Sequence, residues 1–241
     1  MQRFDRFASG LALVLVLALA AGCKQAPAQP EHAHASVTAP SNADARNRDR
    51  HGPPTVDSYV ASLESAGRVA DLDVPVVLEK LALADGTTVA DLGCGPGVFS
   101  LAFARALPHG LVYSVDVEPR QLDRLREHLL ADGLENVVPV LASYSTPHLP
   151  LASCDLIFIA DTYHHFDERV SYMRGLRRFL APGGRLAILE YKPGPLPVGP
   201  PPTHKLKVGE LERELVDAGY EREAKFDTHA NHDFEVWRVR K

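Results

Sequence analysis

The stretch VADLGCGPGVFS, residues 89–100, decides the fold of this chain. It begins with an apolar run typical of a buried strand, and from Val98 onward its apolar residues follow a helical spacing. Glycines at 93, 95 and 97 separate the two segments. Because glycine has no Cβ atom, such a turn lets backbone N–H groups approach a ligand closely. The stretch therefore predicts a strand, a ligand-binding turn and a helix.

The rest of the chain repeats this alternation. Strands are expected at residues 87–93, 110–117, 136–143, 154–161 and 185–191, and helices at 74–83, 98–107, 119–133, 169–181 and 208–220. Strands 222–229 and 233–240 are joined by a loop too short for a right-handed crossover, so they must pair antiparallel. The pattern predicts an α/β fold with a doubly wound, mostly parallel seven-stranded sheet and an antiparallel C-terminal strand.

The first residues have the pattern of an export signal. Arg3 and Arg6 precede an apolar run of about 11 residues, shorter than the roughly 20 that span a membrane. The sequence Ala-Ala-Gly-Cys at 20–23 resembles the bacterial lipobox, although Ala20 stands where Leu is usual. We expect a signal peptide at 1–22, lipidation of Cys23 and attachment to a membrane facing the periplasm. An ordinary cleaved signal and a cytoplasmic protein with an uncleaved N-terminal segment are the alternatives.

Composition divides the remaining chain in two. Residues 23–56 are rich in Ala, Pro and polar residues and predict a disordered tether, because they cannot bury enough apolar surface to fold. Residues 57–241 are long enough for one domain with a sizeable core. The formal net charge of -5 argues against a nucleic-acid partner. The histidines of the tether are dispersed, and no metal site is expected.

The cysteines of the domain are predicted to be free thiols. Cys94 follows the first expected strand, whereas Cys154 begins the fourth. A strand spans roughly 17 Å, and a disulfide allows a Cα separation of about 7 Å at most. A bond between them is therefore not expected.

Two acidic residues frame the glycine turn. Asp91 begins the pattern D-x-G-x-G-x-G, and Asp116 ends the next strand. A carboxylate at the second position can accept both ribose hydroxyls of a nucleoside, which fits NAD as well as other nucleosides. The dinucleotide fingerprint G-x-G-x-x-G would place glycine at 98, where Val98 stands.

Four stretches in order resemble the motifs of class I S-adenosylmethionine-dependent methyltransferases. They are VADLGCGPGVFS, VYSVDVEP, CDLIFIADTYHHF and LRRFLAPGGRLAILEYKPG, and the resemblance covers residues 56–241. It implies a Rossmann-like fold and S-adenosylmethionine as the cofactor. The cofactor-binding positions that it implies are Asp91, Gly93, Cys94, Gly95, Gly97, Asp116, Val117, Glu118 and Ser143.

The resemblance also implies what these positions contact. Asp91 and the glycine turn would face the methionine part, and Asp116 would hold the ribose hydroxyls. Val117 and Glu118 would flank the adenosine. Many members carry an acidic residue near the adenine amine, and Ser143 takes that place here. A serine hydroxyl or a backbone carbonyl accepts a hydrogen bond more weakly than a carboxylate does.

The candidate catalytic residues follow the fourth strand. Asp161, His164 and His165 come where ligands sit in open α/β sheets, and a histidine can take a proton near neutral pH. Tyr163 is a candidate substrate contact. So is His204, at the end of the proline-rich stretch 192–204. The structural alternative is that one histidine packs against the next helix, the other points to solvent and the proline stretch only connects.

The sequence therefore predicts a methyltransferase that acts on a small-molecule acceptor. The alternative is a cofactor-binding protein of the same fold without transfer activity, which the expected export of the chain and Ser143 both motivate. A dehydrogenase is disfavoured by Val98 and by the terminal strand pair.

Overall fold

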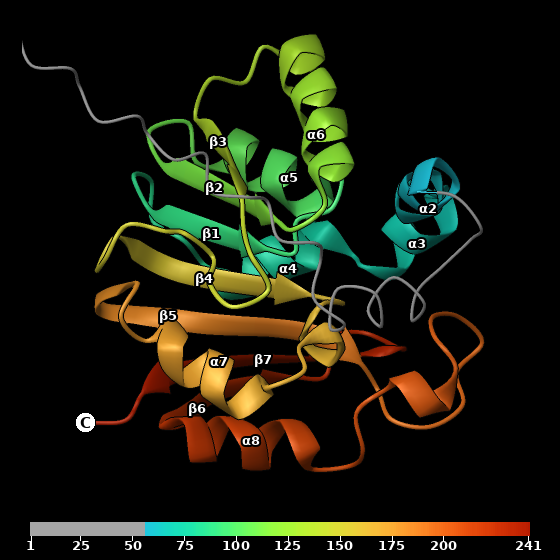
Figure 1. The fold of residues 1–241 in the computed structure, drawn as a ribbon, viewed down its shortest axis with the longest axis vertical. Helices are drawn as coiled ribbons and strands as arrows, with labels where there is room; N and C mark the ends of the chain where they lie inside the picture. Colours follow the sequence, from blue (N-terminus) through green and yellow to red (C-terminus); the bar gives the residue numbers. More distant parts are fainter. Residues whose placement is uncertain (1–55) are drawn as a thin grey trace, which may run out of the picture. The chain divides into compact units, whose positions relative to one another are not determined.

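A computed structural model describes residues 56–241 of the chain, and these form a helix-covered sheet (Figure 1). The expected signal peptide, the lipidated Cys23 and the tether up to residue 55 lie outside the described residues. Within the described part, no helix combines the length and apolar character needed to cross a membrane.

The sheet has seven strands in the order β3-β2-β1-β4-β5-β7-β6. Their bounds are β1 Thr88–Leu92, β2 Leu111–Asp116, β3 Val137–Leu141, β4 Cys154–Ala160, β5 Leu180–Tyr191, β6 Tyr220–Phe226 and β7 His232–Val239. Strands β1 to β5 pair in parallel, while β7 pairs antiparallel with both β5 and β6. The doubly wound sheet and its antiparallel ending are confirmed.

Helices cover both faces of the sheet. They are α2 Val56–Leu63, α3 Ala66–Asp71, α4 Val74–Leu81, α5 Val98–Ala106, α6 Pro119–Asp132, α7 Arg169–Leu176 and α8 Glu210–Ala218, with short 3-10 turns η1 Tyr163–His165 and η2 Pro202–His204. Helices α4, α5 and α6 pack on one face, and α7 and α8 on the other (Figure 1). This arrangement follows from strand–helix–strand units that wind in both directions from β1.

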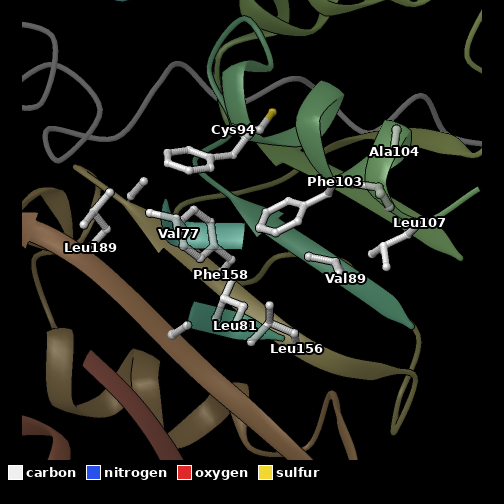
Figure 2. Packing of buried hydrophobic residues seen from close by; sticks show 14 of the residues in the cluster. Val77, Leu81, Val89, Cys94, Phe103, Ala104, Leu107, Leu156, Phe158 and Leu189 are labelled. Atoms are coloured by element: carbon white, nitrogen blue, oxygen red, sulfur yellow. The ribbon is translucent and has the colours of Figure 1, made fainter. Parts of the chain in front are cut away.

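Two apolar clusters form the core because successive side chains of each strand point to opposite faces. Phe158 packs on the α5 face, whereas its neighbour Ile157 packs on the α7 face. On the α5 face, the rings of Phe99 and Phe103 lie 4.6 and 5.3 Å from that of Phe158 (Figure 2). This packing fixes α5, and therefore the turn before it, against the central strands.

The helix expected at 169–181 is wrong in its second half. Helix α7 ends at Leu176, and β5 already begins at Leu180. The N–H groups of Ser153 and Cys154 both donate to the carbonyl of Phe179 at 3.0 Å, so this segment pairs with the start of β4. The strand pairing then shifts between Cys154 and Leu156, which absorbs the Pro-Gly-Gly segment as a bulge.

The cysteine prediction is confirmed. Cys94 and Cys154 are buried free thiols. Among the described residues, no group of three or more His, Cys, Asp or Glu side chains is arranged to hold a metal ion.

Candidate active site

A cavity of about 690 Å³ opens at the carboxyl ends of the central strands. This is the point where the strand order reverses between β1 and β4, and where open α/β sheets bind ligands. Its walls are the glycine turn, the end of β2, residues 142–147, 160–162 and 165–168, and parts of α2, α3, α5, α6 and α7. The fold thus brings segments from most of the domain around one space.

The glycine turn is fixed by backbone contacts. Gly93 and Cys94 donate their N–H groups to the carbonyl of Val115 at 2.8 and 3.0 Å. Gly93 has a φ of 76°, and a Cβ there would clash with the side chain of Thr162. The turn therefore requires glycine for its own geometry and for its close approach to the residues after β4.

Asp116 is held at the glycine turn by two backbone donors. One carboxylate oxygen accepts the N–H of Gly95 and the other accepts the N–H of Glu118, both at 2.9 Å. Burial raises the pKa of Asp116, and these backbone donors oppose the rise. Its carboxylate is thus oriented toward the cavity before any ligand arrives.

Asp91 is buried beside the same turn. Ser100 Oγ donates to Asp91 Oδ2 at 2.6 Å, and Ser114 Oγ donates in turn to Ser100 Oγ at 2.7 Å. Burial raises the pKa of Asp91 to about 7, partly offset by Ser100. A carboxyl of this kind changes its charge readily when a cation approaches.

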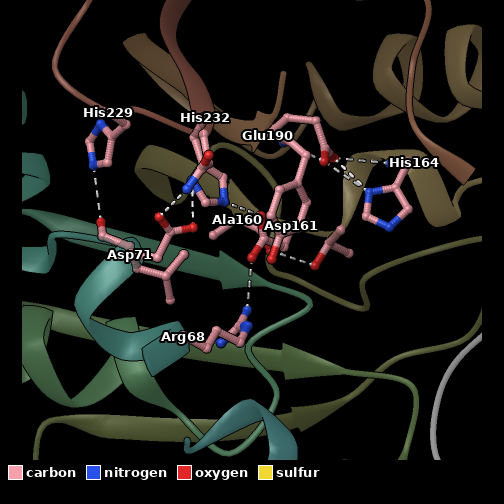
Figure 3. Close-up of polar contacts among 12 residues, drawn as sticks. Arg68, Asp71, Ala160, Asp161, His164, Glu190, His229 and His232 are labelled. Atoms are coloured by element: carbon pink, nitrogen blue, oxygen red, sulfur yellow. Dashed lines mark hydrogen bonds and ion pairs between the residues drawn. The ribbon is translucent and has the colours of Figure 1, made fainter. Parts of the chain in front are cut away.

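A second polar cluster lies after β4 (Figure 3). Asp161 accepts hydrogen bonds from Arg68 Nη2 of α3 and from His232 Nε2 of β7, each at 3.0 Å. Close by, His164 Nδ1 lies 2.9 Å from Oε1 of the buried Glu190. Burial lowers the pKa of His164, but the Glu190 carboxylate outweighs burial and raises it.

Comparison with known proteins shows what part of the chain is similar to. Residues 89–184 match the family described as "Methyltransferase domain". This segment, which includes the glycine turn, β2, β3 and β4, is similar to a methyltransferase domain. A solved structure titled as a SAM-dependent methyltransferase from Aquifex aeolicus shares 26% identity and a TM-score of 0.73, over 77% of this chain and 99% of that one.

Curated relatives are also methyltransferases. Methyltransferase GfsG of Streptomyces halstedii is 31% identical over 54% of this chain and 47% of its own length. Trans-aconitate 2-methyltransferase of Streptomyces coelicolor is 33% identical over 58% of this chain and 43% of its own. The chain spans less than half the length of these two relatives. These findings agree with the fold, the enzyme class and the cofactor class that the sequence motifs implied.

The cavity fits the implied cofactor. Asp116 presents two fixed oxygens, which suits a pair of ribose hydroxyls. Gln121 Oε1 is buried on the cavity wall and has no hydrogen-bond partner among the described residues, so it can accept from a bound ligand. Acidic side chains outnumber basic ones on the described walls, which suits a sulfonium cation.

Most of the predicted cofactor positions line the cavity. They are Asp91, Gly93, Cys94, Gly95, Asp116, Val117, Glu118 and Ser143. Ser143 closes a small turn with Thr146 beside the cavity. Gly97 does not line it: with a φ of 100°, it allows close contact between the turn and Leu125 of α6, because a Cβ there would overlap that side chain.

The predicted catalytic residues divide into two groups. Asp161 and His165 line the cavity, whereas His164 turns into the protein and binds Glu190 through both its ring and its backbone N–H. His164 therefore lies where it can hold the turn after β4, and His165 and Asp161 lie where an acceptor can reach them.

The two predicted substrate contacts lie away from the cavity lining. Tyr163 is fully buried, and its hydroxyl donates to Glu214 of α8 at 2.8 Å. His204 is exposed in η2. Their roles as substrate contacts stay predictions, and the structure brings neither to the cavity lining.

Several lining residues were missed by the motifs. Tyr59 and Arg68 come from the first helices, Gln121 from α6, and the stacked rings of Phe166 and Tyr172 from the segment after β4. A polar glutamine inside the apolar stripe of helix 119–133 was a usable signal for Gln121. Arg68 and His232 carried no comparable local signal.

Proposed function

We propose that this protein transfers the methyl group of S-adenosylmethionine to a small-molecule acceptor. The observation that carries the proposal is the Asp116 carboxylate, which the N–H groups of Gly95 and Glu118 orient into the cavity. The methyltransferase domain match supports it, as do relatives named for small molecules such as trans-aconitate.

The residues that line the cavity have different roles, which depend on their position. When bound, S-adenosylmethionine supplies a methyl group activated by a sulfonium charge. Asp116 holds the ribose hydroxyls, and Asp91 places a carboxyl by the glycine turn. Asp161 and His165 face the acceptor and can accept its proton. Alignment of acceptor and methyl group provides the main acceleration.

Calorimetric titration of the purified domain tests cofactor binding. We expect S-adenosylhomocysteine to bind and NAD not to bind. A folded sample that fails to bind S-adenosylhomocysteine contradicts the proposal, and binding of NAD alone would revive the dehydrogenase interpretation.

A second experiment separates transfer from binding alone. The protein is mixed with cofactor carrying a labelled methyl group and with the small-molecule fraction of an extract of the source organism. Label in a new compound supports a methyltransferase. Binding of S-adenosylhomocysteine without any labelled product favours the alternative, a cofactor-binding protein without transfer activity.

We also propose that Cys23 is lipidated and anchors the protein to a membrane facing the periplasm. The proposal rests on the apolar run and the lipobox-like sequence at 20–23. Fractionation of cells that produce the Cys23→Ser variant tests it. Release from the membrane fraction is expected, and an unchanged cytoplasmic location of both proteins contradicts the anchor.

A further inference from the structure

Asp161 has an unusual backbone at the wall of the cavity. Its φ is 50°, in the left-handed region that few non-glycine residues adopt. Its N–H donates to the carbonyl of Leu189 at 2.9 Å, which fixes this conformation between β4 and β5. Strain of this kind persists where the surrounding structure enforces it, and it is concentrated at functional sites.

The carboxylate of Asp161 is held on both sides. Oδ2 accepts from Arg68 Nη2 and Oδ1 accepts from His232 Nε2, each at 3.0 Å. An ionised carboxylate offers about four lone-pair sites, so each oxygen keeps a further site. Asp161 lines the cavity, and a ligand can approach these remaining sites.

His232 is itself fixed by its surroundings (Figure 3). It is buried at the start of β7, and its ring packs against that of Tyr191, with the ring centroids 4.4 Å apart and the planes tilted by 34°. Its second nitrogen, Nδ1, lies 3.6 Å from Asp71 Oδ2 and has no hydrogen-bond partner among the described residues. The other oxygen of Asp71 accepts from Asn231 at 2.6 Å. His232 is therefore held in an orientation that directs Nε2 at the carboxylate of Asp161.

On the basis of the proposed function, we propose that Asp161 accepts the proton of the acceptor's nucleophilic atom and that His232 and Asp71 are its positioning residues. The acceptor is then a hydroxyl or amine compound, because a carboxylate has no proton to give up at neutral pH. Arg68 Nη2 lies 3.0 Å from Oδ2 of the same carboxylate and holds it from the side of α3.

The transfer forms one bond, breaks another and moves one proton. A bond forms between the acceptor's oxygen or nitrogen and the methyl carbon. The bond from that carbon to the sulfonium sulfur breaks, and its electron pair stays on sulfur. The acceptor's proton moves to an oxygen of Asp161 and leaves to solvent through the cavity.

Variants of His232 test the positioning role by transfer of labelled methyl groups into the small-molecule fraction of the source extract. We expect His232→Ala to lower kcat by roughly 100-fold through loss of alignment, and His232→Gln to recover most of it because its amide can donate in place of Nε2. The affinity for S-adenosylhomocysteine, measured by calorimetry, should stay within about 3-fold in both variants. A variant that only damages the fold would lose both properties.

Matched controls use the neighbouring buried His229, which binds the carbonyl of Leu72 rather than Asp161. His229→Gln should keep the transfer rate. The ring N–H signals of both histidines can be followed by NMR in nitrogen-labelled protein. Asp161→Asn and Asp71→Asn should each shift the signal of His232 and leave that of His229 in place.

Three results would overturn the proposal. The first two are transfer by His232→Ala at the unmodified rate and a His232 signal that Asp161→Asn does not shift. A labelled methyl ester as product would also overturn it, because a carboxylate acceptor needs no base. Failure of the unmodified protein to bind S-adenosylhomocysteine is a different result, which removes the proposed function and leaves the NMR experiment to decide the Asp161–His232 contact.

Discussion

Two acids of the cavity lining, Asp116 and Asp161, are held in different ways. At the glycine turn, backbone N–H groups of Gly95 and Glu118 fix Asp116. After β4, the side chains of Arg68 and His232 fix Asp161. Backbone donors survive substitution of the residue that carries them, whereas a side-chain donor disappears with one substitution. The glycine-turn side therefore suits the cofactor, which does not change. The side after β4 suits the acceptor, which differs among relatives.

Removal of the Asp116 carboxylate should have the largest effect, and it tests the glycine-turn side of the comparison. We expect Asp116→Ala to weaken binding of S-adenosylhomocysteine roughly 100- to 1000-fold, because two hydrogen bonds to a charged acceptor are lost. Calorimetry measures the effect. His164→Ala is the control, since its ring binds Glu190 and not the cavity. Equal weakening by the two substitutions would show that the ribose assignment is wrong.

Gly97→Ala tests whether the glycine turn is required by packing as well as by the ligand. At a φ of 100°, with Leu125 in the path of a Cβ, the substitution should lower the free energy of unfolding by about 2–3 kcal/mol. Gly133→Ala is matched to it, because that glycine has a φ of 63° and open space around it, and about 1 kcal/mol is expected. Urea unfolding gives both values, and equal losses would exclude the packing explanation.

The pH dependence of binding sharpens the role of Asp91. Burial raises the pKa of Asp91 to about 7, so this carboxyl is mostly protonated below pH 7 in the free protein. The ammonium group of S-adenosylhomocysteine favours the ionised carboxyl, so affinity should rise as pH increases through 7, by up to about 10-fold per unit, and then level off. Calorimetry between pH 6 and 8 measures this rise. Asp91→Asn should flatten it; a slope that persists in that variant assigns the proton elsewhere.

Ser143→Asp should give the smallest effect and the opposite sign. A carboxylate at this position would accept from the adenine amine more strongly than the serine hydroxyl, and an improvement of about 3- to 5-fold in affinity is expected. His148→Asp is the control, because this residue is exposed in the same loop and does not line the cavity. If both variants bind alike, Ser143 does not lie at the adenine.

Sequence reasoning reached the glycine-turn side because its residues are contiguous. Asp91, the glycines and Asp116 belong to one strand–turn–helix–strand segment, and strand and helix periods place them without tertiary information. The β4 side is assembled from remote parts: Arg68 and His232 lie 93 and 71 positions from Asp161. No local period predicts such a meeting. The end of α7 was missed for a related reason, since residues 177–180 pair with β4 and a tertiary contact overrides their helical pattern.

The place of β7 has a consequence for synthesis of the protein. This strand is the last of the seven in the sequence, yet it lies between β5 and β6 and brings His232 to Asp161. During translation, the edge of β5 stays unpaired until residues 232–239 have left the ribosome. The growing chain thus exposes an open strand edge, which is prone to association with other chains, from the emergence of β5 until that of β7. Chaperone dependence of the nascent chain should end when β7 docks.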